Sequence, residues 1–153
     1  MYYDFIAAGY DKLYEEEQIA KLKNITKYYT CKGLILDVGA GSGVSSRFFA
    51  SQARVIALDT SEELLSLYEG EKVVARAESL PFRDHIFDAV VSVTALHHAD
   101  FKQALREIKR VVKPNGQIVL SLLKLGKNTP VRLKGFQKLD NGKDWLFIRK
   151  IFL

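Results

Sequence analysis

The chain has 153 residues, of which 48% are hydrophobic and 27% charged, and its formal net charge at pH 7 is +5. This length suits one domain with one sizeable core, and the composition is that of a globular protein, not of a disordered or fibrous one. The single cysteine excludes an internal disulfide, no Cys/His cluster has the spacing of a zinc site, and no apolar run approaches the ~20 residues of a membrane span.

The N-terminus shows no targeting pattern. The first residues, MYYDFIAAGYDKLYEEE, contain acids and tyrosines where a signal peptide has a basic region followed by an apolar one. The lone Cys31 suits a reducing compartment. These features favour a cytoplasmic protein.

The first half of the chain alternates between helical and strand-like patterns. Ile19, Leu22 and Ile25 recur at helical spacing, with acids before them and lysines after them, as a helix dipole favours. Thr60 followed by Glu63 has the pattern of a capping box, which opens a helix. In chain order we expect a helix over 15–29, a buried strand over 34–38, a helix over 45–51, a strand over 54–58 and a helix carrying Leu64 to Tyr68.

The second half continues the alternation and ends in a hairpin. Leu105, Ile108 and Val112 share one helical face, and this helix is expected to stop before Pro114, which cannot continue it. Asn141-Gly142 is the dipeptide that best accommodates the positive φ angles of a two-residue hairpin turn. We therefore expect strands over 72–75, 87–93 and 117–123, a helix over 101–112 and a hairpin over 133–152.

Repeated strand–helix units predict an α/β fold of the doubly wound, Rossmann-like kind, in which a mostly parallel sheet carries helices on both faces. The hairpin adds antiparallel strands and brings the expected sheet to seven strands. Only residues 125–134 separate the fifth strand from the hairpin, whereas a crossover with a helix takes about a dozen residues or more, so the fold is predicted to be truncated there. We expect a single domain over 1–153, with an N-terminal lid or helix (1–30), a ligand-binding core (34–123) and the hairpin.

The strongest local signal is the glycine-rich turn after the first strand. Asp37 is followed by Gly39, Gly41 and Gly43 in the pattern G-x-G-x-G. Glycines there let the backbone approach a ligand and present free N–H groups at a helix N-terminus. The motif alone also fits a tight strand-to-helix turn that binds nothing.

Asp59 strengthens the ligand hypothesis. It ends the second strand, 16 residues after Gly43. A carboxylate at this place can accept hydrogen bonds from both hydroxyls of a ribose. The alternative is that Asp59 caps the following helix, although Thr60 and Ser61 are equally good caps.

The chain resembles the class I S-adenosylmethionine (SAM)-dependent methyltransferases, especially the branch with quinone-biosynthesis and small RNA-modifying members. The resemblance rests on five segments in family-like order over residues 1–123: YYDFIAAGYDKLY, LDVGAGSG, VIALDTS, ARAESLPFRDHIFDAVVSVTALHH and ALREIKRVVKPNGQIVL. The first is similar to the tyrosine-aspartate lid of the family, and the next two to its first and second motifs. The resemblance implies SAM as the cofactor, no metal, and methyl transfer to an acceptor.

The resemblance also implies a role for each matching residue. Gly39, Gly41 and Gly43 would wrap the methionyl part of SAM. Asp37 would orient its ammonium group, directly or through water, and Asp59 would hold the ribose. The other residues implied in SAM binding are Ala77, Glu78 and Leu80 around the adenine, Val93 and Thr94 near the methionine and sulfonium, and Thr60 and Tyr10.

One segment departs from the family pattern. The family often has Asp-Ala-Glu where this chain has Arg76-Ala77-Glu78. A polar contact to the adenine amino group is then either missing or supplied by Glu78.

The candidate catalytic residues are His97 and His98, at the rim where the methyl group is expected to emerge. The sulfonium is already activated and alignment supplies most of the help, so a base is needed only where the acceptor must lose a proton. Packing at the rim is an equally good account of the two histidines. Tyr3, Tyr10 and Tyr14 are candidates for an aromatic lid, or for an N-terminal helix packed on the sheet.

The charge of the chain is concentrated near its C-terminal end and bears on the acceptor. Residues 124–153 carry eight bases and two acids, whereas residues 1–123 have a net charge of −1. The basic segment either discourages edge-to-edge strand pairing or attracts a polyanion. Because the short link leaves the site open unless a partner subunit covers it, and an open site suits a bulky acceptor, we favour RNA or an RNA-associated macromolecule. A quinone-like molecule or another metabolite is the alternative.

Two rival functions share the same features. A catalytically silent SAM-binding partner subunit would keep the cofactor pocket, and no strictly required catalytic residue rules it out. An NAD-dependent enzyme is disfavoured by the glycine spacing and by the methyltransferase-like pattern downstream.

Overall fold

The computed structural model describes residues 2–127 and 129–150, with side chains from residue 12 onward. The helices of this part of the chain are α1 (Tyr2–Ile25), α2 (Val44–Ala50), α3 (Glu62–Leu65), the 3₁₀ helix η1 (Leu96–His98) and α4 (Phe101–Val111). The strands are β1 (Leu34–Val38), β2 (Arg54–Asp59), β3 (Glu71–Val74), β4 (Phe87–Val93), β5 (Val112–Leu123), β6 (Gln137–Asn141) and β7 (Asp144–Lys150).

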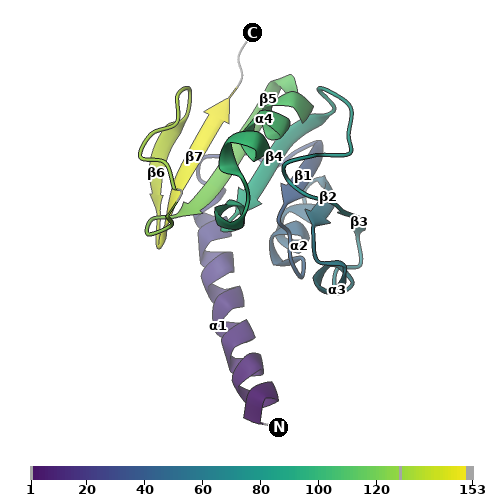
Figure 1. Cartoon of the computed structure of the whole chain (residues 1–153), viewed down its shortest axis with the longest axis vertical. Coiled ribbons are helices and arrows are strands. Elements are labelled where there is room, and N and C mark those ends of the chain that lie inside the picture. Colours follow the sequence, from purple (N-terminus) through teal and green to yellow (C-terminus); the bar gives the residue numbers. More distant parts are fainter. Residues whose placement is uncertain (1, 128, 151–153) are drawn as a thin grey trace.

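The strands form one sheet in the order β3-β2-β1-β4-β5-β7-β6. Neighbours from β3 to β5 run parallel, β7 is antiparallel to β5, and β6 is antiparallel to β7. The chain winds outward from β1 in one direction to β2 and β3, and in the other to β4 and β5. The predicted Rossmann-like, mostly parallel seven-stranded sheet with an antiparallel C-terminal hairpin is confirmed (Figure 1).

Apolar side chains bury the central strands on both faces. Val90 of β4 belongs to the same cluster as Ile108 of α4, whereas its neighbour Val91 packs in the cluster of Leu22 from α1 and Phe49 from α2. This alternation follows because successive side chains of a strand point to opposite faces. With both faces covered, polar ligands are expected at the carboxyl ends of the strands.

The first helix differs from its prediction at both ends. The expected helix over 15–29 begins at Tyr2 and ends at Ile25. Leu22 and Ile25 are fully buried, but residues 12–16 are exposed, and Figure 1 shows the helix extending away from the rest of the domain. Tyr29 lies beyond the helix because a turn carries its ring edge-on against Phe49.

The predicted capping box is wrong. The N-cap of α3 is Ser61, whose hydroxyl accepts the backbone N–H of Leu64 at 3.1 Å. The expected Thr60 is not the cap, and the third position after the true cap is a leucine, not a carboxylate. The helix is a single turn, so Leu67 lies outside it and is 64% exposed.

The later boundaries also shift. β5 begins at Val112 instead of residue 117, because Val112 pairs with Phe87 ahead of a register irregularity that accommodates Pro114. The hairpin is present, but its two-residue turn is Gly142-Lys143 and not the expected Asn141-Gly142. Gly142 has a φ of 66°, whereas Asn141 is the last residue of β6, pairs with Asp144 and has no positive φ. β6 starts only at Gln137. Among the described residues of 124–136 there is neither helix nor strand, as the short link predicts. The predicted end of the hairpin, residues 151 and 152, lies outside the described residues.

Candidate functional site

A cavity of about 690 Å³ lies at the carboxyl edge of the parallel strands. Its wall includes Gly39 after β1, Asp59 at the end of β2, Thr94 after β4 and Leu123 at the end of β5. Lys21 reaches it from α1. β1 is the strand at which the winding reverses, and the crevice beyond such a strand is where doubly wound sheets bind ligands.

The glycine-rich turn borders this cavity. Gly39 and Gly41 have φ angles of 76° and 56°, which strain any residue with a side chain. A Cβ on Gly39 would collide with the Cβ of Ala95, whereas one on Gly41 would meet open space. Gly43 is the N-cap of α2 and does not line the cavity. The turn is therefore fixed on one side and leaves its backbone accessible at Gly41.

Asp59 faces the cavity with a carboxylate that is already oriented. Its Oδ2 accepts the backbone N–H of Gly41 at 2.8 Å, and its Oδ1 accepts that of Ser61 at 2.9 Å. Each carboxylate oxygen can accept a further hydrogen bond. The side chain of Asp59 can therefore receive two hydroxyls, and Thr60 lines the cavity next to it.

The residues expected around the adenine divide into two groups. Ala77 and Glu78 line the cavity, whereas Leu80 is buried in the core and does not reach the wall. Glu78 accepts from Arg76 at 3.1 Å and from the backbone N–H of Asp100 at 3.4 Å, and both contacts use Oε2. Its Oε1 is left to accept an amino group.

Asp37 is fully buried beside the cavity and does not line it. Its Oδ2 accepts the hydroxyls of Ser45 and Ser46 at 2.6 and 2.7 Å, and its Oδ1 has no partner within the described part of the chain. Burial raises the pKa of this carboxyl to about 6, against the opposing effect of the two hydroxyls. A buried acceptor without a donor is unfavourable, so Oδ1 has capacity for an incoming N–H group. Val93, like Asp37, is buried and does not line the cavity.

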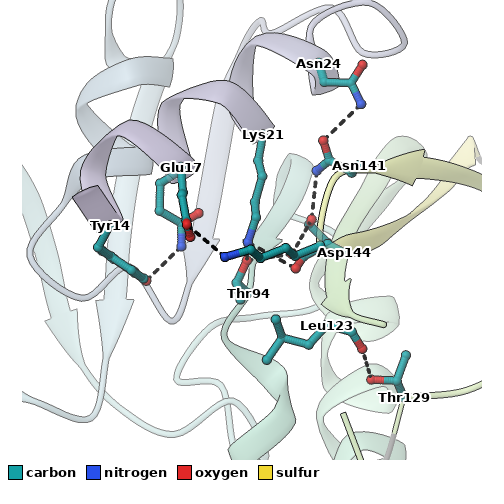
Figure 2. A network of polar contacts seen from close by, with 12 residues as sticks. Tyr14, Glu17, Lys21, Asn24, Thr94, Leu123, Thr129, Asn141 and Asp144 are labelled. Atoms are coloured by element: carbon teal, nitrogen blue, oxygen red, sulfur yellow. Dashed lines mark hydrogen bonds and ion pairs between the residues drawn. The ribbon is translucent and has the colours of Figure 1, made fainter. Parts of the chain in front are cut away.

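A polar network that sequence analysis missed joins α1, the end of β4 and the hairpin (Figure 2). Lys21 Nζ donates to Thr94 Oγ1 at 2.9 Å and to Asp144 Oδ1 at 3.1 Å. Asp144 Oδ2 accepts the hydroxyls of Thr94 and Ser121 at 2.6 and 2.7 Å. The side chains of Lys21 and Asp144 are 9% and 0% exposed. This is a buried ion pair whose carboxylate is fully hydrogen-bonded.

The two histidines line the cavity together from η1, with ring centroids 4.0 Å apart. Burial, and then the neighbouring His98, lower the pKa of His97 from its ordinary value. The His97 ring is therefore neutral near pH 7 and can accept a proton. Tyr14 also lines the cavity, whereas the side chains of Tyr3 and Tyr10 lie outside the described residues.

Two general features complete the description. Across the described side chains, no group of three or more His, Cys, Asp or Glu residues is placed to hold a metal ion. None of the helices in the same part of the chain is both long enough and apolar enough to cross a bilayer. The charged and titratable side chains at the cavity include carboxylates, imidazoles and an ammonium. The backbone N–H groups of Gly39 and Gly41, expected to be free for a ligand, are bonded to Leu58 and Asp59.

Comparison with known proteins identifies the family. Residues 36–120, more than half of the chain, match the family model described as a methyltransferase domain. The chain belongs to the class I SAM-dependent methyltransferases. The matched region contains the glycine-rich turn, Asp59, Glu78 and both histidines, so the cavity of this methyltransferase is formed largely by its family domain.

Curated relatives of this methyltransferase carry different names. An uncharacterized protein of Methanocaldococcus jannaschii is 34% identical over 79% of this chain and 50% of that protein. The ubiquinone/menaquinone biosynthesis C-methyltransferase of Rickettsia prowazekii is 31% identical over 88% of this chain and 59% of that protein. The probable tRNA methyltransferase 9B of Homo sapiens is 34% identical over 57% of this chain and 20% of that protein. The chain spans about half the length of the first two relatives.

Solved structures include a relative in a complex. A putative methyltransferase of Haloferax volcanii, bound to the Trm112 methyltransferase activator, superposes with a TM-score of 0.68 at 27% identity, over 76% of this chain and 57% of that chain. A putative SAM-dependent methyltransferase of Methanococcus maripaludis shares the fold, with a TM-score of 0.74 at 17% identity, over 90% and 87% of the two chains.

Proposed function

We propose that this methyltransferase binds SAM in the cavity and transfers its methyl group to RNA. The observation that carries the donor assignment is the joint lining of one cavity by Gly41, Asp59 and Glu78. These residues offer a turn whose glycine leaves open space for a ligand, a carboxylate for two hydroxyls and a free carboxylate oxygen for an amino group. They match the methionine, ribose and adenine parts of SAM.

The protein contributes to the reaction mainly by orienting the donor and the acceptor. When bound, SAM supplies a methyl group that its sulfonium has already activated. Asp59 and Glu78 fix the nucleoside, and His97 and Leu123 shape the part of the cavity left to the acceptor. The neutral ring of His97 accepts a proton where the acceptor atom must lose one.

The acceptor proposal rests on exposed bases of the link that follows Leu123. Lys124 and Lys143 are paired with carboxylates. In contrast, three exposed bases of the link have no carboxylate within ion-pair distance in the part of the chain that the structure describes: Lys127, Arg132 and Lys134. Unpaired cations on a link that starts from the cavity wall at Leu123 suit a phosphate backbone, which positions a nucleic acid without reading its sequence.

A small apolar acceptor is the second candidate. Leu125 and Val131 of the same link are 99% and 79% exposed. Exposed large apolar side chains on this link suit a quinone-like molecule, and one relative is named for quinone biosynthesis. The same surface also suits a partner subunit, and the Haloferax relative is one that binds an activator.

The test follows the label from the methyl group of SAM. The chain is incubated with labelled SAM, bulk transfer and ribosomal RNA, and a lipid extract that contains quinones, and the Asp59→Ala variant serves as the control. We expect label in the RNA. Label in the lipid fraction alone would replace RNA by the small acceptor. Binding of SAM without transfer to either fraction would favour a silent partner subunit.

A further inference from the structure

We infer that Lys21 binds the carboxylate of the methionine tail of SAM. The inference rests on the proposed use of the cavity as the donor site and adds a residue that lies outside the region matched by the family model. Three features support it: the place of the Lys21 ammonium in the cavity, its one N–H without an acceptor, and the pairing of the other charged groups on the wall.

The Lys21 ammonium lies beside the glycine-rich turn. Its Nζ is 2.9 Å from Oγ1 of Thr94, which directly follows β4. β4 pairs with β1, and the next residue, Ala95, abuts Gly39. Lys21, Gly39 and Thr94 line the same cavity. The positive charge is therefore at the end of the cavity where the methionine tail lies, because Asp59 on β2 takes the ribose.

One proton of this ammonium has no acceptor among the side chains and backbone groups that the structure describes. An ammonium has three N–H donors, and Lys21 uses two of them on Thr94 and Asp144. With its side chain only 9% exposed, Lys21 has little bulk water to satisfy the third. Figure 2 shows the side chain extending from α1 to meet these two partners. A ligand carboxylate in the cavity would complete its hydrogen bonds.

The surrounding charges favour a carboxylate over other ligands. Arg76 is bonded to Glu78, and Lys143 is paired with Glu17. Asp144 keeps two hydroxyl donors, so it stays satisfied when Lys21 shares its ammonium with a second carboxylate. The ammonium of Lys21 is therefore the positive charge on the cavity wall that can turn to a ligand carboxylate without leaving its own carboxylate unsatisfied.

A purely structural role is the alternative. The network continues from Ser121 to Asn141 and from Asn141 to Asn24, with hydrogen bonds of 2.9 and 3.0 Å. It ties α1 to the hairpin whether or not a ligand is bound. The two roles differ in one respect, because only carboxylate recognition depends on the carboxylate of the ligand.

The experiment compares two nucleosides by calorimetry. S-adenosylhomocysteine is titrated against its decarboxylated form, which lacks only the carboxylate. Lys21→Gln is combined with Asp144→Asn, because removal of the lysine alone would leave a buried unpaired carboxylate. Asp144→Asn alone keeps the lysine, and Lys23→Gln changes an exposed lysine of the same helix. Circular dichroism checks that each variant is folded.

We expect the wild type to prefer S-adenosylhomocysteine by about 10- to 100-fold, the range of a hydrogen bond to a charged group. The preference should disappear in Lys21→Gln/Asp144→Asn, with the affinity for the decarboxylated nucleoside unchanged, and should persist in Asp144→Asn and Lys23→Gln. Equal weakening of both nucleosides by the double variant, or no preference in the wild type, would contradict the inference alone. Failure of the wild type to bind either nucleoside would overturn the proposed donor site itself.

Discussion

Asp37 is a residue at which burial and ligand binding oppose each other. Its carboxylate is fully buried, yet one oxygen has no donor among the described residues. Burial raises its pKa from an ordinary 3.8 to about 6. The folded state therefore holds a proton that the unfolded state releases near pH 4, and ionised Asp37 destabilises the fold at neutral pH.

This predicts a pH dependence with a definite sign. The stability from protonated Asp37 is fully present below the unfolded pKa near 3.8 and is lost as pH rises through about 6. As pH rises from 4 to 7, the free energy of unfolding of Asp37→Asn should increase by about 2–3 kcal/mol relative to that of the wild type, which loses this stability. Urea denaturation at several pH values measures this difference. Parallel pH profiles of the two proteins would show that Asp37 does not titrate in this range.

Asp59 provides a direct test of the ribose contact. Asp59→Ala should weaken binding of S-adenosylhomocysteine by about 1–3 kcal/mol, because the hydroxyls lose a charged acceptor and Gly41 loses the bond that fixes its N–H. Calorimetry measures the loss. Asp140→Ala, which removes an exposed carboxylate on the hairpin, is the matched control and should leave the affinity unchanged. An unaltered affinity in folded Asp59→Ala would remove Asp59 from the site.

His97 is predicted to act in the transfer step and not in donor binding. His97→Ala should lower the rate of methyl transfer to RNA by ~10²–10⁴ while S-adenosylhomocysteine still binds. Because burial lowers the pKa of His97, the fall in rate on acidification should occur at a lower pH than for an ordinary histidine. The same two measurements are made on His98→Ala, which removes the second histidine of the pair. Full activity in both variants would support the alternative that the two rings pack at the rim.

At the scale of elements, the link between β5 and β6 decides the acceptor. Lys127→Glu, Arg132→Glu and Lys134→Glu together should weaken binding to bulk transfer and ribosomal RNA and flatten its salt dependence, since fewer counterions are released. Filter binding over a salt series measures both effects. The control reverses three exposed bases elsewhere: Lys12, Lys23 and Arg106. If the wild type binds RNA as weakly as the link variant, with no salt dependence, RNA is not the acceptor.

The core elements were predictable because local patterns determine them. β1 and β4 follow from apolar runs, and the presence of the hairpin follows from Gly142, although its turn lies one residue later than expected. Boundaries that depend on tertiary pairing were not predictable. β5 starts at Val112 because Phe87 pairs with it, and Pro114 alone suggested a turn.

In the candidate site, too, residues set by a local pattern were predictable and residues brought together by tertiary contacts were not. Gly39 and Asp59 follow from spacing along one strand–turn–helix unit and line the cavity as expected. Leu80 was expected at the adenine because of its place in a family motif, but its side chain is buried in the core. Lys21 and Asp144 carry no motif and are 123 residues apart, so only the folded chain shows that they meet.

At the scale of the whole molecule, one cavity gathers residues from most of the chain. Its wall runs from Tyr14 on α1 to Lys143 in the hairpin turn. The chain spans about half the length of its first curated relatives, yet its sheet has all seven strands. The donor half of the site is therefore expected to function on this sheet, whereas acceptor binding depends on the exposed link and on any partner that covers it.

Every role proposed for Asp59, Glu78 and Lys21 requires that the cavity binds SAM. Calorimetric titration of the purified chain with SAM, S-adenosylhomocysteine and NAD measures this binding without knowledge of the acceptor. We predict one site that takes SAM and S-adenosylhomocysteine competitively and does not bind NAD. Binding of NAD with no binding of SAM would show instead that the cavity is a dinucleotide site.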